Sequence, residues 1–139
     1  MKNLRVMVVD DHDLVRQGLR ALLRSQTGWE VVGEAADGRE AVKKAAQLQP
    51  DVVILDIGMP KMNGLEATPL ILQAAPQSAV LIYSMHDSEL LSQAASKAGA
   101  RGYVLKSAGG RDLLAALEAL TEHSTFFTSR VTERSPQVV

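Results

Sequence analysis

Polar residues stand at the ends of several short apolar runs, and they are the residues of this sequence best suited to chemistry. They are Asp10, Asp11, Asp56, Ser84 and Lys106. A carboxylate that directly follows four apolar residues must stay at a rim or find a partner, because burying it unpaired costs too much free energy. If three carboxylates meet at one rim, a hard divalent cation with oxygen ligands relieves their repulsion most simply, and this describes Mg²⁺.

The same five residues are equipped for phosphoryl transfer. A carboxylate held beside Mg²⁺, with a lysine and a hydroxyl nearby, can attack a phosphoryl group and carry it as an acyl phosphate. Asp56 is the best candidate for the nucleophile, because it stands alone after its apolar run, whereas Asp10 and Asp11 form a pair suited to holding metal. Lys106 would neutralise the phosphoryl oxygens during transfer.

The elements that must position these residues are predicted by an alternation along the chain. Short β-branched runs alternate with longer segments of helical periodicity, which is typical of an α/β fold with a parallel sheet. The expected strands are Leu4–Val9, Glu30–Glu34, Val52–Leu55, Ala79–Tyr83 and Gly102–Leu105. The first and third are almost wholly apolar and are expected to be central, whereas the second carries charge and is expected at an edge. Ligands of such sheets bind at the carboxyl ends of the strands, where all five polar residues stand.

Apolar residues recur at helical spacing within 14–23, 41–48, 65–75, 90–98 and 113–120, which predicts five helices. Pro69 conflicts with the third of them, because proline removes a backbone donor, so it should kink or delay that helix. Periodicity is lost after Leu120, and the segment that follows is expected to be a linker or a frayed tail.

Length and composition bound the class of protein. A chain of 139 residues with 46% hydrophobic residues predicts one compact domain that needs no disulfide or metal to hold its core. The absence of cysteine excludes thiolate metal sites and cysteine nucleophiles. A net charge of −1 offers no general attraction to nucleic acid, so we expect no direct nucleic-acid binding by this chain. We also expect no membrane span or signal peptide and a cytoplasmic location, because no apolar run approaches the length a bilayer needs.

In combination, four motifs resemble the receiver domains of two-component response regulators, from Leu4 to about Leu120. The motifs are Val8-Val9-Asp10-Asp11-His12, Ile54-Leu55-Asp56-Ile57-Gly58-Met59-Pro60-Lys61-Met62-Asn63-Gly64, Ile82-Tyr83-Ser84-Met85-His86 and Gly99-Ala100-Arg101-Gly102-Tyr103-Val104-Leu105-Lys106. The residues of the last two motifs, with Asp11-His12 of the first, are most similar to the NarL/FixJ subfamily, in which a LuxR-type helix-turn-helix follows the receiver.

The resemblance implies a flavodoxin-like (CheY-like), doubly wound sheet of five parallel strands in the order 2-1-3-4-5. It implies that Asp56 accepts a phosphoryl group from a sensor histidine kinase. Asp11 and Asp56 would coordinate Mg²⁺ together with the Gly58 backbone carbonyl, and Asp10 would act mainly through a bound water. Lys106 would pair with the phosphoryl oxygens.

The resemblance also implies a switch and a place in a longer protein. The Ser84 hydroxyl would move to bind a phosphoryl oxygen, and Tyr103 would turn inward on activation. Residues 1–121 would form the receiver and 122–139 a linker toward an absent C-terminal effector domain that binds DNA, with a possible homodimer on phosphorylation. Such a chain is no enzyme beyond its own phosphorylation and dephosphorylation.

Other interpretations remain open from the sequence. A stand-alone receiver would act by protein–protein contact. A haloacid-dehalogenase-like phosphatase fits Asp11-His12-Asp13-Leu14-Val15, although it needs an acidic pair on a strand after the lysine. The two aspartates after the first strand could merely cap a helix, and Tyr103 could be plain packing. A row formed by Arg16, Arg20 and Arg24 could be a solvated face or a docking face, and the loop histidines His12 and His86 are expected to face solvent.

Overall fold

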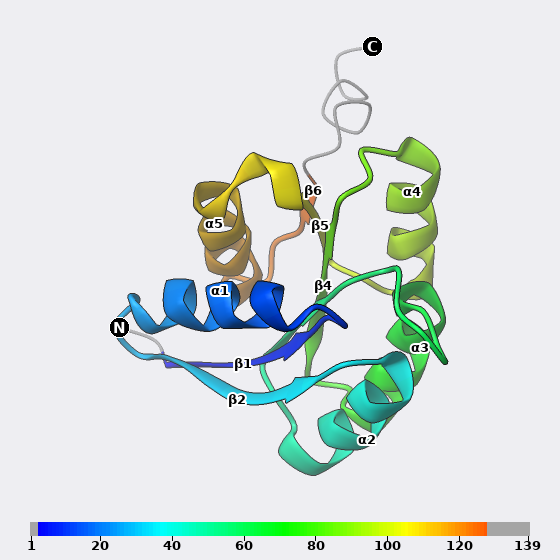
Figure 1. The fold of residues 1–139 in the computed structure, drawn as a ribbon, viewed down its shortest axis with the longest axis horizontal. Helices are drawn as coiled ribbons and strands as arrows, with labels where there is room; N and C mark the ends of the chain where they lie inside the picture. Colours follow the sequence, from blue (N-terminus) through cyan, green and yellow to red (C-terminus); the bar gives the residue numbers. More distant parts are fainter. Residues whose placement is uncertain (1–2, 128–139) are drawn as a thin grey trace.

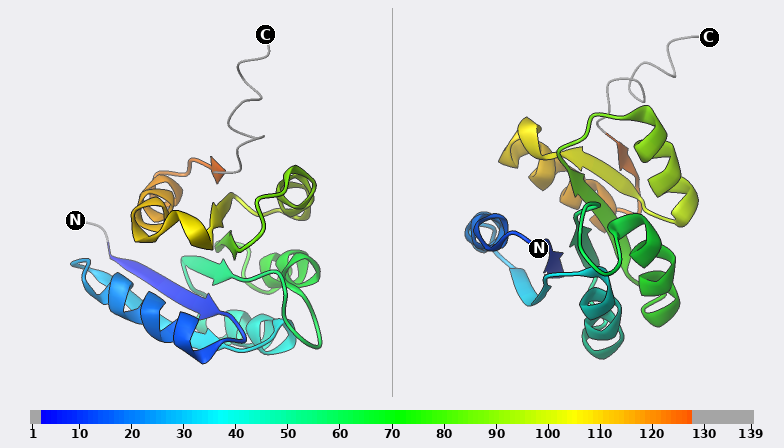
Figure 2. Two further views of the ribbon diagram at one scale, coloured as in Figure 1. Left: turned by 45° about the horizontal axis from the view of Figure 1, so that its top comes forward. Right: turned by 45° about the vertical axis from the view of Figure 1, so that its right-hand side comes forward.

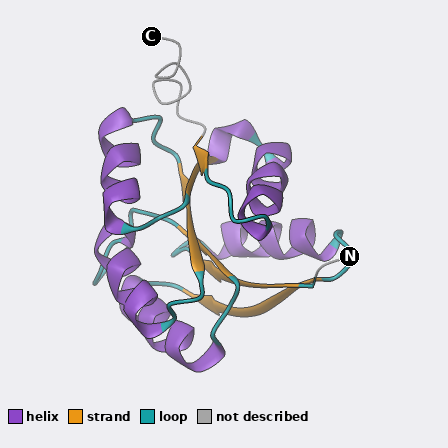
Figure 3. Cartoon of the chain, turned by 180° about the vertical axis from the view of Figure 1, so that it is seen from behind, coloured by secondary structure: helices purple, strands orange, loops and turns teal. Residues whose placement is uncertain are grey.

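The computed structural model describes residues 3–127 as an α/β fold with helices on both faces of a parallel sheet (Figures 1 and 3). Its strands are β1 (Leu4–Val9), β2 (Trp29–Ala35), β3 (Val52–Leu55), β4 (Ala79–Ser84), β5 (Gly102–Leu105) and β6 (Phe126–Phe127). Its α-helices are α1 (Asp13–Arg24), α2 (Gly38–Leu48), α3 (Gly64–Ala74), α4 (Glu89–Ala98) and α5 (Gly110–Thr121), with a 3₁₀ turn at Lys106–Ala108. Every predicted strand and helix is therefore present.

The strand order is β2-β1-β3-β4-β5-β6, and all neighbouring pairs are parallel. The predicted order of the first five strands is confirmed, as are the central positions of β1 and β3 and the edge position of β2. The prediction of exactly five strands was wrong, because Phe126 and Phe127 pair with Gly102 and Tyr103 of β5. A strand of two residues is too short to be predicted from an alternation of apolar and polar residues.

Helices α2, α3 and α4 cover one face of the sheet, and α1 and α5 cover the other (Figure 2). Two apolar layers hold these helices to the sheet and explain why the central strands are apolar throughout. On one face, α2, α3 and α4 pack through small residues such as Ala41, Ala67 and Ala95. On the other face, α1 and α5 pack through leucines such as Leu23 and Leu117. All eight core residues from Val6 to Val9 of β1 and from Val52 to Leu55 of β3 are nearly or fully buried, as strands covered on both sides must be.

Local signals in the sequence set the helix starts. The Asp37 side chain accepts a hydrogen bond from the backbone N–H of Glu40 at the start of α2. Asn63 and Glu66 form a reciprocal capping box at the start of α3, each side chain accepting from the other's backbone N–H. These bonds satisfy backbone donors that the first turn of a helix leaves free.

Pro69 lies inside α3, which starts at Gly64 and runs to Ala74 without interruption. The predicted delay of this helix was therefore wrong. The capping box fixes the helix start upstream of the proline, and the buried Thr68 hydroxyl donates to the Gly64 carbonyl at 2.7 Å. The ring of Pro69 is exposed, so it displaces no core residue, but it deprives the Leu65 carbonyl of its usual helical donor.

Candidate functional site

The carboxyl ends of β1, β3 and β5 bring three charged side chains together. Asp10 follows β1 and is 1% exposed, Asp56 follows β3 and is 8% exposed, and Lys106 follows β5. The Lys106 ammonium nitrogen lies 2.8 Å from Oδ2 of Asp10 and 3.5 Å from Oδ1 of Asp56. One lysine therefore bridges two nearly buried carboxylates that lie on neighbouring strands of the sheet.

Burial raises the pKa of Asp56 above its usual value, and the negative charge of Asp10 adds to the effect. The charge of Lys106 and its hydrogen bond act in the opposite direction, and the backbone N–H of Ile57 helps them, but the net shift is upward. The ionised form of Asp56 is thus held in a site that disfavours it, which makes it receptive to a further positive partner.

The surroundings of Lys106 favour its charged form, whereas those of Asp56 favour the neutral form. Burial lowers the pKa of its ammonium group, but the hydrogen bond to Asp10 and the charges of Asp56 and Asp10 outweigh burial and raise it. The ammonium group is therefore firmly protonated at neutral pH, and it supplies a fixed positive charge at the rim.

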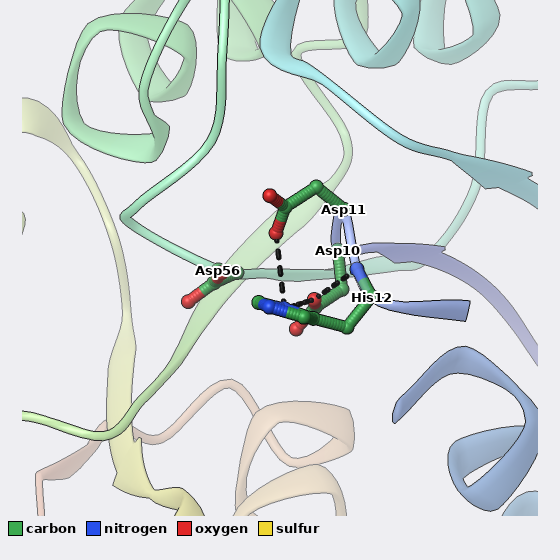
Figure 4. A group of neighbouring side chains, drawn as sticks. All are labelled: Asp10, Asp11, His12 and Asp56. Carbon is green, nitrogen blue, oxygen red and sulfur yellow. Dashed lines mark hydrogen bonds and ion pairs between the residues drawn. The ribbon is translucent and has the colours of Figure 1, made fainter. Parts of the chain in front are cut away.

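Asp11 and His12 complete a group of possible metal ligands with Asp10 and Asp56 (Figure 4). One ligand atom from each of the four lies within 4.8 Å of all the others. Asp11 is exposed, and Nδ1 of His12 lies 3.1 Å from a carboxylate oxygen of Asp10 and 3.1 Å from one of Asp11. Three carboxylates so placed match the hard oxygen donors that Mg²⁺ prefers.

The loop after β3 contains two glycines, of which only Gly64 is required by close packing. A Cβ at Gly64 would lie 2.3 Å from the backbone oxygen of Asp56, so no side chain fits there without moving the site. Gly64 also donates its N–H to the Ile57 carbonyl at 2.8 Å, which closes the loop. At Gly58, which is exposed, a Cβ would meet nothing within 4 Å. The lack of a side chain at Gly58 therefore leaves open space two residues from Asp56.

Ser84 and Tyr103 form a second network at the ends of β4 and β5. The buried Ser84 hydroxyl oxygen accepts the N–H of His86 at 3.0 Å. The Tyr103 ring is fully buried, and its hydroxyl donates to the His86 carbonyl at 2.6 Å. Burial raises the pKa of the Tyr103 hydroxyl, and its hydrogen bond with Ser84 opposes the rise. His86 is thus held by both of its peptide groups.

The predicted site residues therefore fall into two connected sets. Asp10, Asp11, Asp56 and Lys106 lie together, whereas Ser84 and Tyr103 meet at the neighbouring loop. Neither aspartate caps α1, because its N-cap residue is His12 and that cap has no side-chain hydrogen bond. His12 is exposed but is paired with both aspartates, so it belongs to the site rather than facing solvent alone.

The arginine row on α1 is not a uniform solvated face. The Arg16 side chain is only 16% exposed, and both Arg16 and Arg20 form ion pairs with Glu34 of β2. Arg16 also donates to the backbone carbonyl of Asp10. The sequence showed that these arginines share a face, but not which strand that face would meet.

Comparisons with known proteins place this geometry in a family. The family model for the response regulator receiver domain matches residues 6–118. The chain belongs to the response regulator receiver family.

Relatives narrow the subfamily. This receiver is 37% identical to the response regulator GacA of Pseudomonas viridiflava over 94% of its length and 61% of GacA's. It is 36% identical to the transcriptional regulatory protein DegU of Brevibacillus brevis over 93% of its length and 55% of DegU's. The receiver thus spans a little over half the length of these curated relatives.

Solved structures agree with the fold and subfamily. A two-component response regulator of the LuxR family from Aurantimonas sp. SI85-9A1 superposes with a TM-score of 0.88 at 37% identity, over 95% of this chain and 94% of that one. The isolated receiver of RcsB from Salmonella enterica serovar Typhimurium, solved with the phosphomimetic BeF₃⁻, has a TM-score of 0.85 at 28% identity, over 94% and 97%. The predicted resemblance to LuxR-family receivers is confirmed.

The haloacid-dehalogenase interpretation was wrong. The receiver model covers most of the chain, and the strand that follows Lys106 consists of Phe126 and Phe127, with no carboxylate. None of the helices within residues 3–127 has the length and apolar character needed to cross a bilayer.

Proposed function

We propose that this receiver accepts a phosphoryl group on Asp56 and relays a signal by the resulting change of conformation. One observation carries the proposal: Asp56, a nearly buried carboxylate with a raised pKa, lies 3.5 Å from Lys106 and is grouped with the two aspartates after β1. A structural ion pair would need only one carboxylate for one lysine. The surplus of negative charge at this rim instead suits a site that takes up a cation.

The donor set fits Mg²⁺. Asp11, Asp56 and the Gly58 carbonyl would hold the ion, with Asp10 acting mainly through a bound water. When bound, Mg²⁺ would neutralise charge on the phosphoryl oxygens during transfer. Asp10 also holds Lys106 in place through the 2.8 Å ion pair, which directs the ammonium group toward Asp56.

The reaction transfers one phosphoryl group between two protein side chains. A carboxylate oxygen of Asp56 attacks the phosphorus of a phosphohistidine on a sensor histidine kinase. The new O–P bond forms as the P–N bond breaks, the electron pair of that bond stays on the imidazole, and an acyl phosphate results. Lys106, whose pKa is raised, stays protonated and pairs with a phosphoryl oxygen. Hydrolysis by water later restores the carboxylate, so the chain acts on no substrate beyond its own phosphoryl group.

The switch follows from the second network. Phosphorylation adds roughly −1.5 to −2 charges and three strong acceptors beside Asp56. The Ser84 hydroxyl gains a new acceptor, and its movement would act on the loop held through His86. Tyr103 is already inside, with its hydroxyl on the His86 carbonyl, so this loop and the tyrosine are linked. A phosphoryl group at Asp56 would therefore favour the arrangement that also keeps Tyr103 inward.

The relatives support proposals for the effector domain and the partners of this receiver. The named relatives include transcriptional regulators that are longer than this chain, which supports a DNA-binding effector domain reached through residues 122–139. We propose in addition that a sensor histidine kinase phosphorylates the chain, that it forms a homodimer on phosphorylation and that it acts in the cytoplasm. We do not propose that residues 1–121 bind nucleic acid directly.

Mass spectrometry tests the phosphorylation. The wild type incubated with acetyl phosphate and Mg²⁺ should gain the mass of one phosphoryl group, and the gain should disappear in EDTA. Asp56→Ala should show no gain, whereas Asp51→Ala, which changes an exposed aspartate before β3, should behave as wild type. An equal gain in wild type and Asp56→Ala would refute the assignment.

A further inference from the structure

The guanidinium group of Arg16 connects three elements at the edge of the site. Nη1 donates to the backbone carbonyl of Asp10 at 2.5 Å, Nε donates to Oε1 of Glu34 at 3.1 Å, and Nη2 lies 3.0 Å from Oδ1 of Asp13. With 16% of its side chain exposed, Arg16 is the most buried of the arginines in the α1 row. A charged group in this position must be well partnered, and all three of its nitrogen atoms are used.

The carbonyl that Arg16 holds belongs to the peptide unit joining Asp10 to Asp11. Because a peptide unit is planar, fixing the direction of its oxygen also fixes the direction in which the chain enters Asp11. Other bonds fix Asp10 itself, since its N–H donates to the Ala35 carbonyl and its side chain pairs with Lys106. Asp11 is exposed, and the side-chain partner the structure gives it is His12. The orientation of Asp11 therefore depends on the peptide that Arg16 holds.

Glu34 on β2 holds Arg16 in turn. Its two carboxylate oxygens receive Arg16 and Arg20, one each, and its own backbone carbonyl accepts the Lys44 ammonium group. Arg20 shares this carboxylate, but within residues 3–127 it has no hydrogen bond or ion pair to the loop that carries Asp10 and Asp11. Arg16 thus has two contacts that Arg20 is not given, one to Asp13 and one to the Asp10 carbonyl, and only the second reaches the peptide before Asp11.

We propose that Arg16 is a positioning residue for the metal-binding carboxylates: it sets the Asp10–Asp11 peptide so that Asp11 faces the cation, and Glu34 holds it in that position. The proposal rests on the proposed function, because it concerns the Mg²⁺ site of the same rim. Arg16 touches neither the cation nor the phosphoryl group. Its effect passes through a backbone bond, in the way that outer-shell partners tune metal ligands elsewhere.

Calorimetric titration of the full chain with Mg²⁺ alone tests this, with Arg16→Ala compared with Arg20→Ala. Each variant removes one arginine from Glu34, so both lose an ion pair between α1 and β2, and both should show a lower melting temperature in EDTA. Only Arg16→Ala releases the Asp10–Asp11 peptide. It should weaken Mg²⁺ binding by about 10-fold, near the lower end of losses seen for outer-shell residues, whereas Arg20→Ala should stay within about 2-fold of wild type.

The conservative change Arg16→Lys provides a further comparison. Lysine can donate to the Asp10 carbonyl but cannot also reach Glu34 and Asp13 in the fixed geometry of a guanidinium. It should recover part of the lost affinity, and it also serves as the test if Arg16→Ala does not fold. The Mg²⁺ concentration that half-saturates labelling by acetyl phosphate should rise in parallel, while the rate at saturating Mg²⁺ changes little.

The outcomes separate this inference from the function on which it rests. Equal Mg²⁺ affinities for Arg16→Ala and Arg20→Ala, with a normal wild type, would overturn the positioning role and leave the proposed function intact. A wild type that binds no Mg²⁺ would overturn both. A loss of affinity confined to Arg16→Ala, measured at a temperature where circular dichroism shows both alanine variants folded, supports the proposal.

Discussion

Replacing Lys106 by methionine removes the one positive charge that joins Asp10 to Asp56 while keeping a chain of similar length. The Asp10 side chain is 2% exposed and that of Lys106 is 14% exposed, so the ion pair between them is largely buried. Removing one partner of a buried pair costs about 3–5 kcal/mol, because the other charge stays behind unpaired. Asp10 keeps the His12 N–H at 2.8 Å as a donor, so we expect a loss of about 3 kcal/mol, at the low end of that range.

Mg²⁺ should change this cost. The variant lacks the ammonium charge beside the proposed ligands, so it should bind the cation more tightly than wild type does. A ligand at 100 times its Kd stabilises the folded state by about 2.7 kcal/mol, and tighter binding increases that gain. The stability difference between wild type and Lys106→Met should therefore be largest in EDTA and should narrow as Mg²⁺ is added.

Urea unfolding followed by circular dichroism, in EDTA and in excess Mg²⁺, measures both quantities. Lys43→Met, which changes an exposed lysine of α2, is the matched control and should shift the free energy of unfolding by less than about 0.5 kcal/mol in either condition. A loss below about 1 kcal/mol for Lys106→Met in EDTA, or a difference from wild type that Mg²⁺ does not narrow, would refute the reasoning.

Two further predictions concern the nucleophile and the proline. Burial, with the charge of Asp10, raises the pKa of Asp56, so the folded state binds this proton more tightly than the unfolded chain does and stability falls as pH rises from the unfolded to the folded pKa. Asp56→Asn in EDTA should thus be more stable than wild type at pH 7, and thermal melts should show the advantage shrinking toward pH 4; an advantage that grows on acidification would contradict this. Pro69→Ala restores a backbone donor for the Leu65 carbonyl in α3 and should stabilise the protein by roughly 1–3 kcal/mol. A urea midpoint at or below that of wild type would show that the helix already compensates for the proline.

The fold was largely predictable because its strongest signals are local. Four consecutive apolar residues before Asp56 predict a buried central strand without knowledge of any neighbour, and Asn63 with Glu66 announces a helix start within a few residues. β6 was missed because its strand structure depends on a distant neighbour and not on a local signal. Phe126 and Phe127 become a strand only because the edge of β5 is there to receive them.

The site was predicted as a set of residues but not as a set of contacts. The rule that parallel strands end at one edge brings Asp10, Asp56 and Lys106 together. It does not show that Lys106, 96 residues away in the chain, makes its shorter contact to Asp10 rather than to Asp56. Nor does helical spacing show that Arg16 turns toward Glu34 and the Asp10 carbonyl, because the direction of a helix face depends on its packing.

β6 has a consequence for association between copies of this domain. A sheet edge presents unpaired N–H and C=O groups that invite another chain to add a strand. On the β5 side, Phe126 and Phe127 cover that edge opposite Gly102 and Tyr103 with backbone from the same chain. The opposite edge, β2, carries the charges of Glu30 and Glu34, and its register with β1 is irregular between Val6 and Met7. Both features discourage regular pairing with another strand. β6 is itself the outer strand on the β5 side, but its two residues offer another chain little backbone to pair with. We therefore expect two copies that meet to do so through their helices and loops.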